Sequence, residues 1–352
     1  MPRAAGFCYK AGSVRGNPPM RLLAIALLLA GPVAAQEALP IAPGHTLRFH
    51  AAPVAERPVS RTYAIPLAAG DWLAVTAPAA IIQGASTEPS IALQGPGGET
   101  ARDFGRLVFQ APAAGTYRLA LRDFHALAVS RYPAGHPLVD PGLTQGDIRL
   151  DATPLGATPR FATEPLDLRY DDAPPPSGWP ARLAITLGDA MTFHLYRREA
   201  LHQMDLWPAD PTPVLAALLR GREPIEARPD LPLFPVGNFS VAFAAQAERR
   251  HGPCIDWLRY VARWTQEAAW PFESLTYVAL GLSRDGRIFA TATAELVPTP
   301  LRGQPSAQRD GHSPAYEAAL RRQVATDPAA LTPRLAALDA VLVSLVIPCA
   351  AP

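Results

Sequence analysis

The chain has 352 residues, which is too long for one ordinary globular domain and favours two domains. Nearly half of the residues, 49%, are hydrophobic and 18% are charged, so the composition excludes a wholly disordered chain. The 32 basic and 31 acidic residues almost balance, and four of the basic residues but none of the acidic ones precede residue 36. The rest of the chain is therefore slightly acidic. We expect no nucleic-acid partner, because such partners require clustered Lys and Arg.

The first 35 residues have the pattern of an export signal. Met20 and Arg21 precede an apolar run at 22–30, and small residues at 33–35 end the segment. The run is shorter than the roughly 20 apolar residues of a membrane span, and the small residues suit a signal peptidase. We expect cleavage near Ala35 and a periplasmic or extracellular mature chain without a transmembrane segment. Residues 1–19 are either a long basic leader or lie upstream of a true start at Met20, and we favour the second interpretation.

Two cysteines, Cys254 and Cys349, follow this segment. An even number of cysteines in an exported protein favours a disulfide over the alternative of two buried free thiols. In the chain-entropy model, a bridge that closes a loop of this length stabilises the fold by about 4 kcal/mol. Every basic residue after Lys10 is Arg, which suits a GC-rich bacterial genome.

Residues 36–140 carry short β-rich runs separated by Pro and Gly. These runs are 46–50, 59–65, 71–76, 90–93, 107–110, 116–121 and 126–132. Many short strands with close turns predict an all-β sandwich of the jelly-roll type. Trp72, Phe109 and Tyr117 are interpreted as core residues of this sandwich.

Three stretches in this region carry a family resemblance: Gly70-Asp71-Trp72-Leu73, the strand and turn at 90–98, and Gly115-Thr116-Tyr117. They are similar to the bacterial pre-peptidase C-terminal domain, a small β-sandwich appended to secreted proteins and proteases. The resemblance spans most of residues 45–132 and implies a PPC-like β-sandwich module in a secreted bacterial protein.

Residues 141–178 are rich in Pro, Asp and Gly and are predicted to link two domains. The clearest spacer is Asp171-Asp172, which three prolines follow at 174–176. Two adjacent acids suggest calcium binding, but no ladder of alternating oxygen ligands follows them. We therefore expect a solvated linker here rather than a metal site.

Residues 179–352 are predicted to form an α+β domain in which helices pack on an antiparallel sheet. Strand-like runs at 181–187 and 191–196 flank a turn, and 275–282 and 287–296 flank Asp285-Gly286, which is typical of a tight hairpin. Helices are expected at 213–219, from Pro314 onward and at 333–345. We expect the last helix to fold back and bring Cys349 to Cys254.

Residues 254–270 are predicted to form an amphipathic helix, because apolar residues recur there at helical spacing. This spacing places Trp257, Tyr260 and Trp264 on one side of the helix. Such a stripe either packs in the core, which is the simpler interpretation, or forms an aromatic platform that binds a glycan or peptide. These three residues are the ligand-binding candidates of the sequence.

The order of short motifs in this half carries a second resemblance. The motifs are 231–235, 244–246, 257–260, 275–277, 281–287 and 296–298. Their order is similar to that of an uncharacterised extracytoplasmic domain of bacterial secreted proteins. This resemblance implies an exported protein and assigns no activity.

Residues with an obvious chemical role are few. The chain contains no Gly-x-Ser-x-Gly elbow, His-Glu-x-x-His motif, phosphate loop or dinucleotide fingerprint. His194, Glu199 and His202 form the most suggestive cluster, but a helical zinc pair needs two histidines four residues apart, and these are separated by twice that spacing. Asp285 is interpreted as a turn residue. We therefore expect no metal, no cofactor and no catalytic residue.

The sequence thus favours an exported, non-catalytic binding or interaction protein whose partner is a cell-envelope glycan or protein. One alternative is a secreted hydrolase with a site assembled in the C-terminal domain, which convergent His and acidic side chains would favour. Another is that the β-sandwich is the recognition module and the second domain its scaffold.

Overall fold

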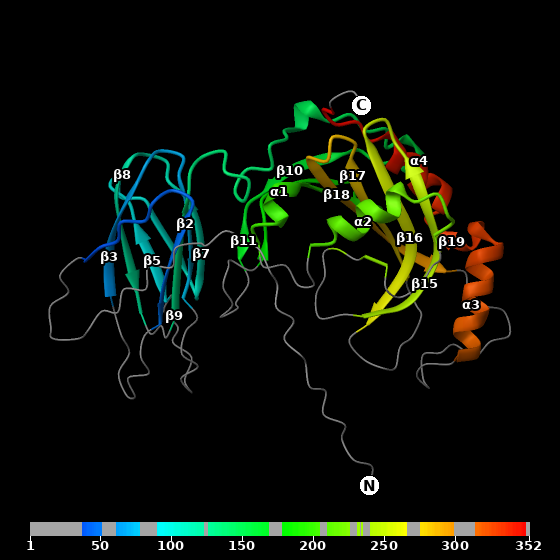
Figure 1. Cartoon of the computed structure of the whole chain (residues 1–352), viewed down its shortest axis with the longest axis horizontal. Helices are drawn as coiled ribbons and strands as arrows, with labels where there is room; N and C mark the ends of the chain where they lie inside the picture. Colours follow the sequence, from blue (N-terminus) through cyan, green and yellow to red (C-terminus); the bar gives the residue numbers. More distant parts are fainter. Residues whose placement is uncertain are drawn as a thin grey trace, which may run out of the picture. The chain divides into compact units, whose positions relative to one another are not determined.

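The computed structural model describes residues 37–50, 61–77, 90–122, 126–168, 178–204, 210–225, 231–232, 234, 240–265, 275–298 and 314–349. The predicted export signal and the spacer at 171–176 lie outside these residues. Within the described ranges, no helix is both long enough and apolar enough to cross a membrane. The architecture is a β-sandwich followed by an α+β domain, as the sequence predicts (Figure 1).

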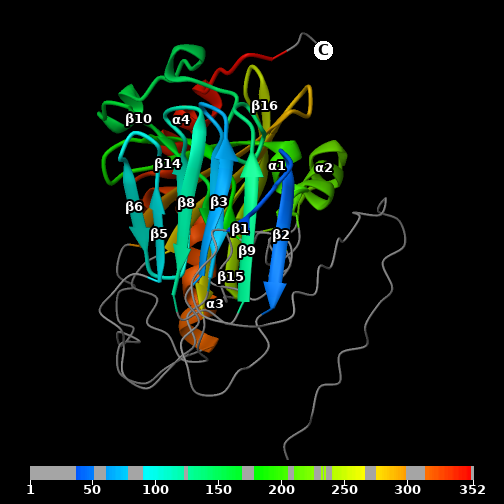
Figure 2. The same ribbon diagram turned by 90° about the vertical axis from the view of Figure 1, so that its left-hand side faces the viewer.

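The sandwich has two sheets (Figure 2). One sheet contains, in spatial order, β1 (Glu37–Ala38), β3 (Arg61–Leu67), β8 (Gly115–Leu121), β5 (Ile91–Gln94) and β6 (Thr100–Asp103). The other contains, in spatial order, β2 (His45–His50), β9 (Ala126–Tyr132), β4 (Trp72–Thr76) and β7 (Arg106–Gln110). Neighbouring strands pair antiparallel, except that β1 is parallel to β3. Within the described residues, each of the seven predicted runs coincides with a strand. The short strands β1 and β6 were not predicted.

The sandwich core follows from the alternation of side chains along each strand. In β8 the side chains of Tyr117, Leu119 and Leu121 are buried while Thr116 and Arg118 face outward. The rings of Phe109 and Tyr117 lie 5.6 Å apart, and the Tyr117 hydroxyl donates to the Ala113 carbonyl. The core assignment of Tyr117 is therefore confirmed.

The C-terminal domain is built on one large antiparallel sheet (Figure 1). Its strands, in spatial order, are β10 (Arg160–Glu164), β13 (Arg182–Thr186), β14 (Thr192–Arg197), β18 (Ile288–Pro298), β17 (Leu275–Ser283), β16 (Ile255–Thr265) and β15 (Ser240–His251). A further short strand, β19 (Leu331–Thr332), pairs with β18, and β11 (Asp167–Leu168) pairs separately with β12 (Gly178–Trp179). The predicted hairpin is β17 and β18, where Gly286 adopts a left-handed φ of 71° and the Asp285 carboxylate accepts from the backbone N–H of Arg287.

Helices cover both faces of this sheet. On one face, α4 (Leu335–Ser344) and α3 (Pro314–Thr326) share a core with Trp257 and Tyr277. On the other face, α1 (Arg198–Leu201) and α2 (Thr212–Arg220) share a core with Tyr260. The three predicted helices at 213–219, from Pro314 and at 333–345 are confirmed. A Cys254–Cys349 disulfide joins the start of β16 to the segment after α4, as predicted.

The helix predicted at 254–270 is wrong, because residues 255–265 form β16. This strand lies between β15 and β17 and is covered on both faces, so Trp257 and Val261 are buried on one side while Leu258 and Tyr260 are buried on the other. A strand buried on both faces loses the alternation of polar and apolar residues that would identify it.

The structure also differs from the expectation of a linker at 141–178. Leu143, Ile148 and Ala152 lie in the core that contains α4, and β10 pairs with β13 along five residues. Leu143, Ile148, Ala152 and β10 therefore contribute to the core and the large sheet of the C-terminal domain. The high content of Pro, Asp and Gly in this segment reflects two short 3-10 turns, Gln145–Asp147 and Thr153–Leu155.

Candidate functional site

The structure separates the three residues of the predicted His/Glu cluster. His194 lies on β14 with its Nε2 atom 3.8 Å from the Glu164 carboxylate. Glu199 faces Arg197, and the Nδ1 atom of His202 lies 2.8 Å from the Asp210 carboxylate. In the part of the chain that the structure describes, His, Cys, Asp and Glu side chains form no group of three that could hold a metal ion.

The aromatic candidates do not share a face. Trp257 and Tyr260 are fully buried on opposite sides of β16, and the Tyr260 hydroxyl donates to the Pro232 carbonyl. Trp257 packs over Gly281, where a Cβ atom would come within 2.5 Å of its ring. The side chain of Trp264 lies outside the described part of the structure. The shared face expected from a helix does not exist, and ligand binding by these residues stays a prediction.

A half-exposed His202 pairs with the mostly buried Asp210 beside α2. Asp210 accepts from the backbone N–H and the hydroxyl of Thr212, while Thr212 Oγ1 in turn accepts from Arg198 Nε. The carboxylate holds one ring nitrogen of an imidazole that is 50% exposed, which is the arrangement of an oriented general base. Among the described residues, no hydroxyl or thiol contacts the other ring nitrogen, so the pair lacks a protein nucleophile there.

A second polar group lies on the sheet itself, where strand register brings together residues far apart in the sequence. Arg182 on β13 pairs with Tyr196 on β14, and His194 on β14 pairs with Thr291 on β18. Directly paired residues point to the same face of a sheet, so Arg182, His194 and Thr291 share the face that α1 and α2 cover. Glu164 on β10 is the cross-strand partner of Arg182 and forms an ion pair with it.

The environment of this group keeps His194 neutral. Burial is the main cause that lowers the pKa of His194, and the Arg182 guanidinium lowers it further, while the Glu164 carboxylate partly offsets both effects. Burial also raises the pKa of the neighbouring Tyr196 phenol far above its usual range. At neutral pH the charges in this group are therefore the paired Arg182 and Glu164.

Several donors of this group have no acceptor. The Nε and Nη1 atoms of Arg182 and the hydroxyl of Thr291 are buried and make no hydrogen bond within the described part of the chain. Thr291 is only 1% exposed. Buried polar groups in folded proteins are nearly always hydrogen-bonded, so these donors need an explanation. Phe289 and Thr291 of β18 are both buried, and no local sequence pattern reveals that donors in this region lack acceptors.

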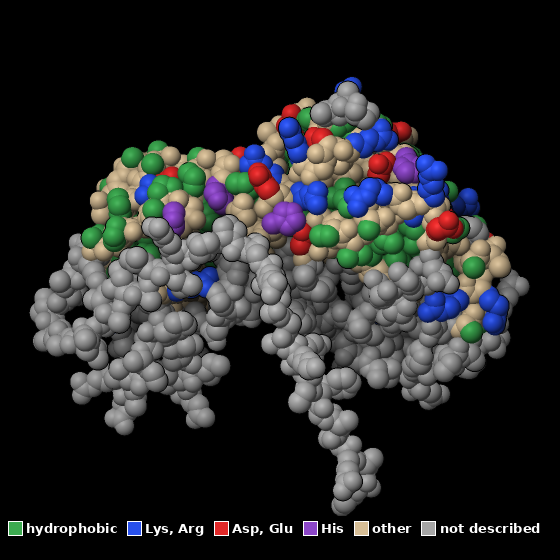
Figure 3. Space-filling model, in the orientation of Figure 1, with side chains coloured by type: hydrophobic (Ala, Val, Ile, Leu, Met, Phe, Trp, Pro, Cys, Tyr) green, Lys and Arg blue, Asp and Glu red, His purple; other side chains and the backbone are tan. Residues whose placement is uncertain are grey.

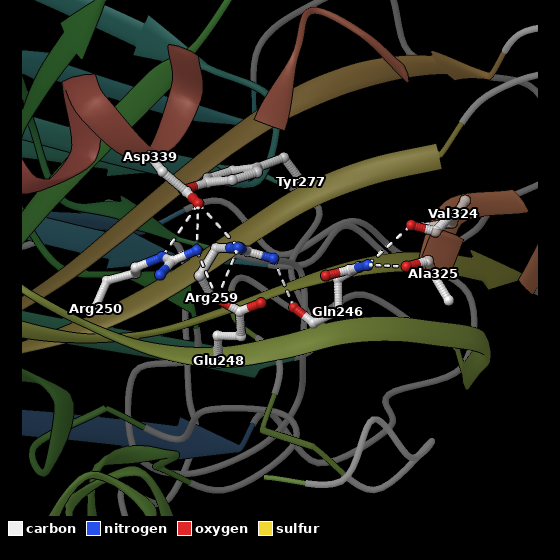
Figure 4. A network of polar contacts seen from close by, with 8 residues as sticks. All are labelled: Gln246, Glu248, Arg250, Arg259, Tyr277, Val324, Ala325 and Asp339. Atoms are coloured by element: carbon white, nitrogen blue, oxygen red, sulfur yellow. Dashed lines mark hydrogen bonds and ion pairs between the residues drawn. The ribbon is translucent and has the colours of Figure 1, made fainter. Parts of the chain in front are cut away.

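A further polar network lies on the opposite face and centres on Asp339 of α4 (Figure 4). One carboxylate oxygen accepts from Arg250 and Arg259 at 2.8 and 2.9 Å, and the other accepts from the Tyr277 hydroxyl at 2.9 Å. Arg259 is 2% exposed and also donates to the carbonyl of Gln246. Burial raises the pKa of Tyr277, and the Asp339 charge raises it further, so the phenol stays protonated and donates.

This network holds the helices on the sheet. Gln246 has a left-handed φ of 54° at a register shift in β15, and its side-chain amide donates to the Val324 carbonyl of α3. The same residue therefore connects Arg259 in the sheet to α3, while Asp339 connects Arg259 to α4. We interpret the network as structural, because the Asp339 carboxylate, the Tyr277 hydroxyl and both Nη atoms of Arg259 find partners within the protein, although the buried Nε atom of Arg259 has none among the described residues.

Charged side chains of both signs are interspersed on the face of the molecule drawn in Figure 3. Charged side chains near the surface pair locally: Asp256 contacts His251 at 2.9 Å and Arg284 at 3.6 Å. Exposed pairs of this kind contribute little to stability. The buried groups are therefore the better guide to function.

The neutral state of His194 predicts a pH dependence of stability. A pKa below that of the unfolded chain means that the unfolded state binds more protons in acid, so the free energy of unfolding falls as the pH drops below about 6.5, the ordinary His value. We expect His194→Gln to flatten this slope in urea unfolding measured at pH 5 and pH 7.5. His45→Gln, a change at an exposed histidine, serves as the control. An equal dependence of unfolding free energy on pH in His194→Gln and wild type would contradict the prediction.

No protein-family model matches the sequence. No curated protein matches it either. Among solved structures, PliG of Aeromonas hydrophila, a periplasmic lysozyme inhibitor of g-type lysozyme, aligns with 28% of this chain and 99% of its own at 16% identity and a TM-score of 0.18. Such a low TM-score supports no conclusion about a shared fold or activity. The resemblance to the pre-peptidase C-terminal domain stays a prediction.

Proposed function

We propose that the protein is an exported bacterial binding protein that recognises a component of the cell envelope without chemically altering it. The observation that carries this proposal is the set of buried donors without acceptors, Arg182 Nε and Nη1 and Thr291 Oγ1, in the described C-terminal domain. A binding protein supplies such donors to its ligand, since a site for a small molecule needs a few well-placed polar groups.

The Cys254–Cys349 disulfide supports the exported location. Structural disulfides persist in the periplasm and outside the cell, whereas the cytosol keeps thiols reduced. The export signal expected at residues 1–35 agrees with this location, as does the proposed PPC-like sandwich. Peptide mass spectrometry of the protein from a cell fraction outside the cytoplasm is the direct check.

A sedimentation experiment tests the binding function. The oxidised chain from Gln36 onward is incubated with purified insoluble envelope glycan, and separately with envelope proteins immobilised on beads. We expect saturable retention by one of the two materials, and retention that survives moderate salt, because the proposed contacts are buried. Absence of saturable retention on both materials would overturn the binding function.

One observation favours a second candidate function, a hydrolase. The oriented imidazole of His202, held by Asp210, is a suitable base for activating water. A hydrolase would release soluble fragments from the glycan, and His202→Ala would abolish that release. Retention of the glycan without fragments would leave binding as the function.

A further inference from the structure

The donors without acceptors on the sheet define what a ligand must offer. All three atoms donate hydrogen bonds or, for the Thr291 hydroxyl, readily do so. A neutral His194 beside them can donate from one ring nitrogen as well. A ligand that satisfies the group must therefore be rich in acceptors, which is the property of an oxyanion.

The charges already present in the group limit the negative charge of a ligand that it can bind. Arg182 is already paired with Glu164, and the charged groups that face His194 are these same two residues. One further negative charge is compatible with the guanidinium and its two unused donor atoms. A dianion would lie close to the Glu164 carboxylate in a partly desolvated place, where like charges repel strongly.

The group has one side open to solvent. The side chains of His194 and Glu164 are 21% and 34% exposed, whereas Arg182 Nε and Nη1 and the Thr291 hydroxyl are closed off. A ligand would approach the buried donors from this side, past His194 and Glu164, and Glu164 lies on the edge strand β10. An aromatic cluster continues from this group, since Tyr196 lies on the same face and its ring contacts those of Phe234 and Phe289.

We propose that Arg182, His194 and Thr291 form a binding site for the carboxylate of an envelope ligand. The site rests on the proposed binding function and names the chemical class that it recognises. Two sources can offer this group, the acidic sugar of a glycan and the C-terminus of a peptide. The carboxylate satisfies the donors of Arg182 and Thr291, and the rest of the ligand extends along the solvent-facing side of the group.

The proposal is tested on the oxidised chain from Gln36 by isothermal titration calorimetry with three probes: acetate, D-glucuronate and N-acetyl-D-alanine. Sodium chloride at matched ionic strength is the blank, and sulfate is the dianion. We expect saturable binding of at least one carboxylate and weaker binding of sulfate. Glucuronate binding tighter than that of the acyl amino acid identifies the sugar as the source, and the reverse order identifies the peptide.

Thr291→Val is the decisive variant, because it replaces the hydroxyl by a methyl group of similar shape. Without ligand it removes a buried donor that has no acceptor, so its thermal unfolding temperature should stay equal or rise, which also shows that it folds. We expect its carboxylate affinity to fall at least about tenfold, the loss typical of a hydrogen bond to a charged group.

Arg182→Met is expected to abolish carboxylate binding. Arg131→Met is the matched control, since its side chain has the same 16% exposure but donates to Asp71 and to the Ile41 carbonyl in the sandwich. It should lose stability and keep the carboxylate affinity of wild type.

Binding of the carboxylates by Thr291→Val and Arg182→Met with wild-type affinity would overturn the site, even if the chain is retained by the envelope glycan. No binding of any carboxylate by wild type would overturn it equally. Carboxylate binding without retention by any envelope material would instead uphold the site and overturn the proposed envelope function.

Discussion

Replacing Asp339 by Ala is expected to lower the free energy of unfolding by about 3–5 kcal/mol, the usual loss when one partner of a buried ion pair is removed. Arg259, almost completely buried, would lose the carboxylate that lies 2.9 Å from its Nη2 atom. The remaining acid, Glu248, lies 3.3 Å from the same atom but is itself 40% exposed and also contacts Arg250. The Tyr277 hydroxyl would lose its acceptor as well.

Urea unfolding monitored by tryptophan fluorescence measures this loss. Asp256→Ala is the matched control, because its carboxylate contacts His251 and Arg284 at the surface, where such pairs contribute about 0–1 kcal/mol. A loss below 1 kcal/mol for Asp339→Ala would show that the network does not hold α4 on the sheet.

Removing the disulfide is expected to cost a similar amount. Cys254 and Cys349 are 95 residues apart, and in the chain-entropy model a bridge across such a loop contributes about 4 kcal/mol by restricting the unfolded chain. The double variant Cys254→Ser/Cys349→Ser should therefore unfold at lower urea concentration than the oxidised protein.

Adding a reductant to wild type provides the internal comparison. Reduced wild type and the double serine variant should unfold at the same urea concentration, and reductant should leave the variant unchanged. Identical curves for oxidised and reduced wild type would mean that the bridge does not stabilise this fold.

The parts of the fold that the sequence predicts correctly are those with local signals. Asp285-Gly286 between two β-rich runs specifies the hairpin of β17 and β18, and Pro314 marks the first residue of α3. The close turns and short runs of residues 45–132 are sufficient for the sandwich. The even cysteine count predicts the bridge without any knowledge of the fold.

β16 shows where local patterns fail. Its apolar residues fit a helical period because the strand is covered on both faces, so every position except a few is apolar or aromatic. Arg259 lies in the core, where its two Nη atoms donate to Asp339, Glu248 and the Gln246 carbonyl. Asp339, a partner distant in the sequence, makes the burial of Arg259 possible. The spacing of residues within 254–270 therefore cannot predict that Arg259 is buried.

The candidate site is beyond sequence reasoning for the same reason. Arg182 and Thr291 are more than a hundred residues apart in the sequence and meet only through the register of β13, β14 and β18. A shift of one residue in any of these pairings would turn His194 to the opposite face of the sheet. The alternation in β14 predicts a strand but not which strand lies beside it.

The central claim is that the protein binds its envelope ligand without chemically altering it. The fate of the retained glycan tests this claim most directly. The oxidised chain from Gln36 is incubated in molar excess with purified envelope glycan for several hours, and the supernatant and pellet are analysed by mass spectrometry. The account predicts that the protein sediments with a glycan whose composition is unchanged and that no soluble fragments form. Fragments in the supernatant, lost on His202→Ala, would contradict it and identify a hydrolase.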